Sequence, residues 1–326
     1  MRLNVRTNAI RRLKATVINS YSLENRKLAN SVKRLISEGP INWEDAISEK
    51  ICTSEPLLFG RLGGVEASCL GIHKDLQNGY KRPVRYLQAR FLYKKRLTQL
   101  CNNAGVYPPN RESFDFFCSE HIEALTQLDI FSVWGKPAAW IEENFISKPR
   151  ILVVSGDTSF PWFESRDSFS RLGWANAFQG KKVLVISPFI KSISEQVPKL
   201  PKLFEPLLIP SIDFDYLEAP LTQGGLNDEK SYEIHLLNIK RKMEKLDFDI
   251  ALVSAGAYSL PLAAHAKKMG KIGIHGGGAT QIFFGITGQR YDNYSQVRKF
   301  SNLHWKRPYE SERPTNWQSI EDGCYW

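Results

Sequence analysis

The sequence has no long apolar run, since strand-like stretches such as 151–154 and 183–186 are only four residues long. A membrane-spanning helix needs roughly 18 consecutive apolar residues, so an integral membrane protein is excluded. Cysteine is also scarce. The five cysteines are scattered, and no C-x-x-C pair is present to form a zinc site or a redox dithiol. We interpret them as buried or incidental thiols.

Two nucleotide-binding motifs are missing, because neither G-x-G-x-x-G nor G-x-x-x-x-G-K-S/T occurs. A nicotinamide enzyme and a P-loop kinase are therefore disfavoured. Residues 1–20 are basic but lack the apolar core and small-residue cleavage site of a secretory signal, which predicts a cytoplasmic protein. A content of 42% hydrophobic and 12% aromatic residues excludes global disorder.

Positive charge is concentrated near the N-terminus. The 326 residues include 44 Lys or Arg and 34 Asp or Glu, which gives a net charge of +10, and residues 1–34 contain nine of these basic residues and one acid, Glu24. Ile10, Leu13 and Val17 recur at helical spacing, which predicts a basic amphipathic helix. Such a helix either lies on an anionic membrane surface or packs on the protein body with its basic face in solvent. We expect residues 1–50 to form a basic helical segment and residues 51–326 to form one α/β domain.

A second basic run over 81–96 contains no acid and interleaves the aromatic residues Tyr86, Phe91 and Tyr93. Nucleic-acid binding is the alternative that this run raises. The run matches no known nucleic-acid module, so we predict no nucleic-acid partner.

From residue 56 onward, short apolar runs alternate with helical stretches. Such strands belong to a sheet covered on both faces, which predicts a Rossmann-like α/β/α sandwich with a mostly parallel sheet. The predicted strands are Leu57–Arg61, Ile130–Trp134, Ile151–Val154, Val183–Ser187, Leu207–Ile209, Ile250–Ser254 and Ile272–His275. The predicted helices lie near 90–103, 113–127, 137–146, 188–197, 229–245 and 260–268. We expect Ser187 and Pro188 to begin the 188–197 helix, and region 198–227 to be an irregular connection.

Three loops that follow predicted strands are rich in glycine and small polar residues: 59–68, 254–261 and 275–290. Glycine lets a backbone approach a ligand closely, and the N–H groups at a helix start favour phosphate. Ligands of open α/β sheets bind at the carboxyl ends of the strands. The three loops together indicate a phosphate-bearing ligand, whereas each loop alone is typical of a tight strand-to-helix turn.

Charged residues within these loops are candidates for binding and catalysis. Arg61 suits a diphosphate, and Glu66 suits a sugar hydroxyl, a divalent ion or general-base chemistry. The alternative is an Arg61–Glu66 ion pair that braces the turn. Arg290 is a further phosphate candidate, while His275 is either a ligand or an ordinary histidine at a strand end.

Several blocks of this sequence resemble the bacterial GT-D fold glycosyltransferases of surface polysaccharide assembly. The blocks are GRLGGVEA at 60–67, KKVLVISPF at 181–189, 247–271, IHGGGATQIFFGITGQRYD at 274–292 and the tail 307–326. The resemblance implies a Rossmann-like fold that binds a nucleotide-diphosphate sugar. It also implies a D-x-E motif beside the donor diphosphate and its metal ion.

Gly64, Val65 and Glu66 occupy the positions of that motif, so its first carboxylate is missing. We therefore expect no protein-held metal, with Glu66 as the ligand if one binds; any Mn²⁺ or Mg²⁺ would arrive with the nucleotide sugar. Arg61, Arg290 and the backbone N–H groups of 276–281 are expected to neutralise the leaving diphosphate instead.

We predict a glycosyltransferase in which Glu66, on one of the converging strand-end loops, is the catalytic residue, as general base or as a ligand of the donor sugar. The expected nucleotide-sugar ligands are Arg61, Gly63, Gly64, Ser254, Gly256, Tyr258, His275, Gly276, Gly277, Gly278, Thr280, Gln281 and Arg290. The expected partners are a nucleotide-diphosphate sugar and a glycan or lipid-linked glycan acceptor, with residues 1–34 holding the enzyme at the inner face of the cytoplasmic membrane. The alternative is a non-catalytic nucleotide- or polyanion-binding protein that assists polysaccharide assembly.

Overall fold

The computed structural model describes residues 43–79, 81–133, 141–146, 148, 150–155, 173–225, 229–292 and 294–326. The predicted basic helix within residues 1–34 lies outside the described residues, as do residues 1–42 of the predicted segment 1–50.

The described residues contain a seven-stranded sheet in the order β3-β2-β1-β7-β6-β4-β5, and every strand pair is parallel. The strands are β1 (Leu57–Arg61), β2 (Ile130–Val133), β3 (Leu152–Ser155), β4 (Lys182–Ser187), β5 (Asp213–Glu218), β6 (Ile250–Val253) and β7 (Ile272–His275). This arrangement confirms the predicted α/β class and its Rossmann-like parallel sheet.

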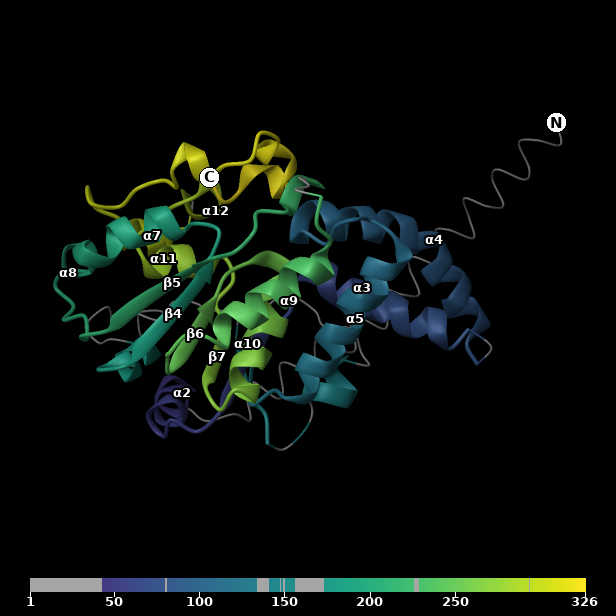
Figure 1. The fold of residues 1–326 in the computed structure, drawn as a ribbon, viewed down its shortest axis with the longest axis horizontal. Coiled ribbons are helices and arrows are strands. Elements are labelled where there is room, and N and C mark those ends of the chain that lie inside the picture. Colours follow the sequence, from purple (N-terminus) through teal and green to yellow (C-terminus); the bar gives the residue numbers. More distant parts are fainter. Residues whose placement is uncertain are drawn as a thin grey trace.

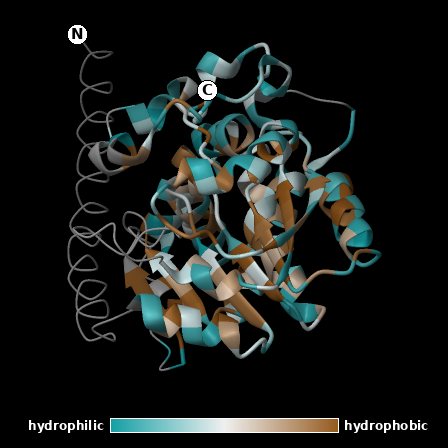
Figure 2. Ribbon diagram, turned by 90° about the vertical axis from the view of Figure 1, so that its left-hand side faces the viewer, coloured by the Kyte–Doolittle hydropathy of each residue, from teal (hydrophilic) through white to brown (hydrophobic). Residues whose placement is uncertain are grey.

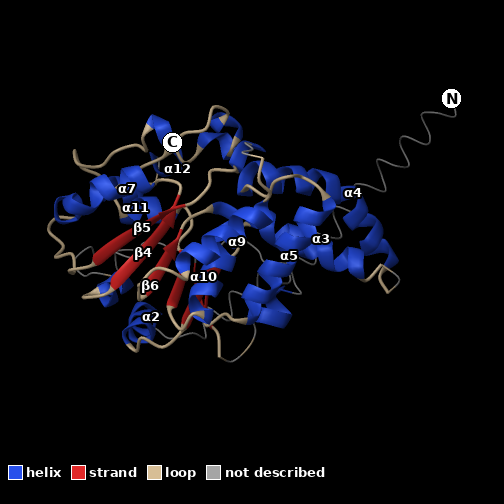
Figure 3. Ribbon diagram, viewed as in Figure 1, coloured by secondary structure: helices blue, strands red, loops and turns tan. Residues whose placement is uncertain are grey.

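Helices cover both faces of the sheet (Figure 3). The α-helices of the described residues are α2 (Trp43–Cys52), α3 (Gly64–Gln77), α4 (Pro83–Gln99), α5 (Arg111–Thr126), α7 (Ile190–Gln196), α8 (Leu200–Leu203), α9 (Tyr232–Met243), α10 (Ser259–Lys268), α11 (Ala279–Phe283), α12 (Gln289–Asp292) and α13 (Ser295–Phe300). A π-helix, Leu100–Ala104, continues α4. Another π-helix, Glu142–Ile146, lies within the predicted helix near 137–146, whose residues 137–140 fall outside the described part.

Successive residues along a strand contribute to opposite cores. In β4, Val183 and Val185 join the core that contains α2, α8 and α11, whereas Leu184 and Ile186 join the core that contains α3, α5, α9 and α10. This follows from the two-residue repeat of a strand. Figure 2 shows the resulting hydrophobic strands inside the molecule, with hydrophilic residues on outward helix faces.

The predicted strand Leu207–Ile209 is wrong, and the edge strand is β5 instead. Its sequence DFDYLE places Asp213 and Asp215 in solvent, with Phe214 and Tyr216 half-buried. An edge strand has a partner on one side only, so it tolerates polar residues that a search for unbroken apolar runs overlooks. Region 198–227 is accordingly not one irregular connection, because it contains α8 and β5.

The predicted start of α7 at Ser187 and Pro188 is also wrong, because the helix begins at Ile190. The Ser187 hydroxyl instead accepts a hydrogen bond from the Phe189 N–H at 3.1 Å. The Phe189 ring is buried against Trp326, with 5.9 Å between the ring centroids. The turn at 187–189 is therefore packed against the distant C-terminal tail. Rules for helix capping consider only neighbouring residues, so they do not predict this contact.

Within the described residues, no helix combines the length and the apolar character needed to cross a bilayer. All five cysteines are free; Cys69, Cys101 and Cys118 are buried, whereas Cys52 is exposed.

Candidate functional site

The connections leaving β1 and β7 diverge at the carboxyl edge of the sheet. These strands are neighbours, yet α3 after β1 packs on one face of the sheet and α11 after β7 packs on the other. Such a switch point opens a crevice between the two loops and is where open α/β sheets bind ligands. A cleft of about 530 Å³ lies there, within the range typical of small-molecule sites.

The first wall of the cleft comes from the loop and helix after β1. Gly63 precedes α3 and Glu66 is the third residue of that helix, with its carboxylate folded over Gly63, where a Cβ would collide with it. Burial raises the pKa of Glu66, and repulsion from Glu321 adds to the increase. A hydrogen bond from its own backbone and attraction to Arg61 act in the opposite direction. This carboxyl group is therefore suited to hold a proton at higher pH than an ordinary glutamate.

Arg61 is the last residue of β1, and its guanidinium lies against the turn that follows β7. A Cβ at Gly277 would be 3.0 Å from Arg61 Cζ, and Arg61 Nη1 donates to the Gly276 carbonyl at 3.5 Å. Burial lowers the pKa of Arg61, although an arginine remains charged in proteins. Attraction to Arg61 also lowers the pKa of Glu66, so the two side chains interact electrostatically, and the turn-bracing alternative stays a prediction.

The turn Gly276–Gly278 is held by the neighbouring strand. The N–H groups of Gly276 and Gly277 both donate to the Val253 carbonyl, at 2.9 and 3.3 Å, and the Ser254 hydroxyl donates to the Gly277 carbonyl at 2.7 Å. Strand β6 thus binds the two amides that the sequence analysis assigned to a diphosphate, and that assignment stays a prediction. The same bonds hold the turn in place against Arg61.

Arg290 enters the cleft from α12 on the other side of this turn. Its guanidinium pairs with Glu321 and lies 4.7 Å from the centroid of the Tyr325 ring. Burial alone would lower the pKa of Arg290, but the surrounding Tyr325, Cys324, Tyr291 and Glu321 raise it overall. Arg61 lies against Gly277 and Arg290 lies against Gly278, so two cations of the cleft lie beside one glycine turn.

Most of the residues predicted from the sequence meet in this one cleft. Its lining includes Arg61, Gly63, Gly64, Glu66, Ser254, Gly256, His275, Gly277, Gly278, Gln281 and Arg290. Burial lowers the pKa of His275 well below its ordinary value, and His275 Nδ1 has no hydrogen-bond partner among the described residues. Gln281 Nε2 donates to the Tyr325 carbonyl at 3.0 Å, so this side chain connects the cleft to the tail.

Three predicted residues do not line the cleft itself. Tyr258 is fully buried, with its hydroxyl 3.1 Å from Thr222 Oγ1 and its ring 4.7 Å from that of Tyr232. Its place in the core follows from the 3-10 turn that starts α10. Gly276 and Thr280 line an adjoining cavity of about 20 Å³, which shares Arg61 and His275 with the cleft and is itself too small for a nucleotide.

The sequence analysis missed the part of the cleft that the C-terminal tail provides. Glu321, Tyr325 and Trp326 line it, together with Asn103 of the π-helix and Gln223 after β5. Tail backbone groups bond directly to α12: the Arg290 N–H donates to the Cys324 carbonyl at 3.0 Å. The many aromatic residues of 317–326 predict that this segment is buried. The local sequence does not indicate against which part of the fold the tail packs.

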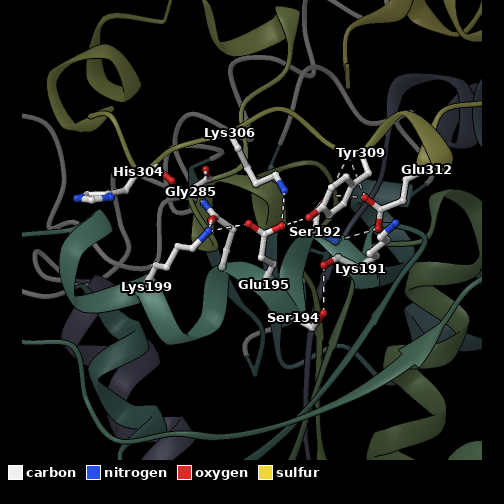
Figure 4. Close-up of polar contacts among 11 residues, drawn as sticks. Lys191, Ser192, Ser194, Glu195, Lys199, Gly285, His304, Lys306, Tyr309 and Glu312 are labelled. Carbon is white, nitrogen blue, oxygen red and sulfur yellow. Dashed lines mark hydrogen bonds and ion pairs between the residues drawn. The ribbon is translucent and has the colours of Figure 1, made fainter.

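A network on α7 fastens the start of this tail (Figure 4). Glu195 accepts hydrogen bonds from Lys199 at 2.7 Å, from Lys306 at 2.6 Å and from the Tyr309 hydroxyl. These donors lower the pKa of Glu195 to about 2. Glu312 accepts bonds from the N–H groups of Ser192 and Tyr309, at 3.0 and 3.2 Å.

The carboxylates near the cleft do not form a metal site. Among the described residues, no group of three or more His, Cys, Asp or Glu side chains could hold a metal ion. Glu321 is engaged by Arg290, which leaves Glu66 as a single carboxylate. Magnesium and manganese prefer several oxygen ligands, so this donor set does not fit a metal held by the protein.

Comparison with known protein families, with curated proteins and with solved structures found no match to this chain.

Proposed function

We propose that the protein is a glycosyltransferase that moves a sugar from a nucleotide-diphosphate donor to a hydroxyl of a surface glycan. The acceptor glycan is linked to a lipid when the enzyme uses it. The observation that carries the proposal is one cleft at the switch point of the sheet, where Arg61 and Arg290 flank a glycine turn near Glu66. Its size suits a nucleotide sugar, and its charges suit a diphosphate. The resemblance of blocks 60–67 and 247–292 to GT-D enzymes supports the same reaction class.

In the proposed reaction the acceptor oxygen attacks the anomeric carbon of the donor sugar. The bond from that carbon to the diphosphate oxygen breaks, and its electron pair leaves with the nucleoside diphosphate. Glu66 takes the proton of the acceptor hydroxyl, a role that its raised pKa favours. Arg61 and Arg290 stabilise the negative charge that develops on the leaving diphosphate.

Glu321 has a supporting part in this proposal. Its carboxylate pairs with Arg290 and also raises the pKa of Glu66. An incoming diphosphate would compete with Glu321 for Arg290. Donor binding would then exchange an internal carboxylate for the phosphate charge, at little electrostatic cost.

A screen of nucleotide-diphosphate sugars by thermal shift, with and without Mn²⁺, would identify the donor. With that donor, we expect Glu66→Gln to retain binding and to slow transfer by about 10²- to 10⁴-fold. Arg290→Ala should weaken donor binding by about 10- to 100-fold, because a charge-assisted hydrogen bond is lost. Arg298→Ala, at an exposed position on α13, is the matched control and should leave both quantities unchanged.

Saturable donor binding with no transfer and no donor hydrolysis would favour the nucleotide-binding alternative. Folded Glu66→Gln and Arg290→Ala proteins that transfer sugar as fast as the parent would refute the site assignment.

A further inference from the structure

Helix α4 exposes three large apolar side chains in one stripe. The exposed fractions are 64% for Val84, 53% for Leu87 and 72% for Phe91. Their spacing of three and four residues places them on one face of the helix. The opposite face buries Ala89 and Leu97 in the core with α3 and α5. The stripe is thus at the centre of the outward face of α4, and folding of the described residues leaves it uncovered.

Basic residues flank this stripe and acids are missing. At 100° per residue, exposed Arg90 and Lys94 fall on one side of the stripe and exposed Lys95 falls on the other. Lys81 and Arg82 are exposed just before the helix. No Asp or Glu occurs between Asp75 and Glu112. The outward face of α4 therefore combines an apolar centre with cationic margins, the pattern of helices that lie in a membrane interface.

The position of α4 in the fold suits such contact. It packs beside α3 at the end of the molecule away from β4 and β5 (Figure 1). The π-helix that continues it supplies Asn103 to the cleft. A surface that contacts α4 would consequently be connected to the cleft by one continuous helical segment.

We propose that the outward face of α4 docks on an anionic membrane surface. Val84, Leu87 and Phe91 insert at the boundary between headgroups and acyl chains, and the flanking lysines and arginines contact lipid phosphates. The inference rests on α4 alone and does not depend on the proposed glycosyltransferase activity.

Charge and polarity favour this partner over two others. A nucleic acid contacts cations and stacking aromatics, and it would leave Val84 and Leu87 against a polar backbone. A second copy of the chain docked through the same face would bring together two faces that carry basic residues and no acid, and like charges repel. An anionic bilayer offers both an apolar layer and negative charge.

The test uses the full-length protein and vesicles of phosphatidylcholine with or without about 30% phosphatidylglycerol. We expect the parent to bind the anionic vesicles, and we expect Val84→Ser/Leu87→Ser/Phe91→Ser to bind them at least about tenfold more weakly. The matched control is Leu208→Ser/Leu303→Ser, which removes two other exposed leucines, 87% and 88% exposed, and should bind as the parent does. Lys94→Gln/Lys95→Gln should weaken binding and reduce its dependence on salt.

A Phe91→Trp variant gives an independent signal. Its fluorescence should shift to the blue when anionic vesicles are added, whereas Leu303→Trp should not respond. Melting temperatures near that of the parent would exclude misfolding as the cause of lost binding, since all these side chains are exposed.

Three results would overturn the proposal. The triple serine variant could bind vesicles as tightly as the parent, which would place the membrane contact elsewhere, with residues 1–34 the first region to examine. The parent without vesicles could sediment as a dimer that the triple variant abolishes, which would make α4 a self-association surface. A single-stranded oligonucleotide could bind α4 in preference to vesicles. None of these substitutions touches the cleft, so donor binding and transfer remain separate measurements.

Discussion

At the scale of single residues, Glu66 makes folding less favourable as it ionises. Burial raises the pKa of its carboxyl group above the ordinary value of 4.5, and Glu321 contributes in the same direction. The folded state therefore holds the Glu66 proton more tightly than the unfolded state does. As pH rises from about 4.5 through the folded pKa, the folded protein loses the stability that this proton provides.

Glu66→Gln removes this dependence while keeping the shape of the side chain. We expect the variant to melt at a higher temperature than the parent at pH 8, and we expect the difference to shrink as pH falls toward 5. Thermal melts of both proteins across this range test the prediction. Glu49→Gln, at an exposed position on α2, is the control and should show no such trend. A variant less stable than the parent at pH 8 would mean that hydrogen bonds to the ionised Glu66 outweigh its burial.

At the scale of elements, the sequence predicts buried strands well and edges poorly. The strands Leu57–Arg61 and Ile272–His275 were predicted with the bounds they have, because both consist of apolar residues closed by a polar side chain at the switch point. Both strands end at the same edge of the sheet. Candidate residues at and after their ends, such as Arg61 and Glu66, therefore meet in the cleft. Strand β5 is not predicted from the sequence because its residues alternate in polarity.

The position of the C-terminal tail is not predicted from the sequence for a different reason. Trp326 is packed against Phe189, 137 positions earlier by the numbering, and such long-range contacts leave no periodic signal in the sequence. Local patterns specify an element, whereas the placement of the tail depends on which surface remains apolar after the sheet has formed.

The turn between β7 and α11 gives a prediction at this scale. Gly277 has a φ of +55°, and a Cβ there would be 3.0 Å from Arg61 Cζ. Gly277→Ala should cost about 1–2 kcal/mol of folding free energy, since L-residues avoid this conformation, and it should also displace Arg61. Urea unfolding measures the first effect, and titration with a nucleoside diphosphate measures the second.

Gly180 is the matched control for this turn. Its φ is +71°, and no atom lies within 4 Å of where its Cβ would be. Gly180→Ala should therefore lose similar stability with no change in nucleoside diphosphate affinity. Equal affinity in both alanine variants would show that Arg61 does not contribute to binding.

At the scale of the whole molecule, the C-terminal tail completes the cleft that the sheet begins. The tail is held at its start by α7, through the bonds from Lys306 to Glu195 and from the Ser192 N–H to Glu312, and at its end by α12. Trp326 also packs on Phe189. Glu321, Tyr325 and Trp326 of this segment line the cleft. We therefore expect a change in the bonds at α7 to alter the cleft although Glu195 does not line it.

Glu195→Gln tests that coupling, because Glu195 accepts hydrogen bonds from Lys306 and Tyr309 and does not line the cleft. Its pKa is lowered to about 2, so its contribution to stability is present above about pH 4.5 and is lost as pH falls toward 2. At neutral pH the variant should speed hydrogen exchange over 303–326 and weaken nucleoside diphosphate binding, while exchange in β6 and β7 stays slow. Glu49→Gln again serves as the control. If tail exchange rises and affinity does not change, the tail covers the cleft without shaping it. If affinity falls while tail exchange stays at the parental rate, Glu195 acts by another route, and the coupling through Lys306 and Tyr309 is wrong.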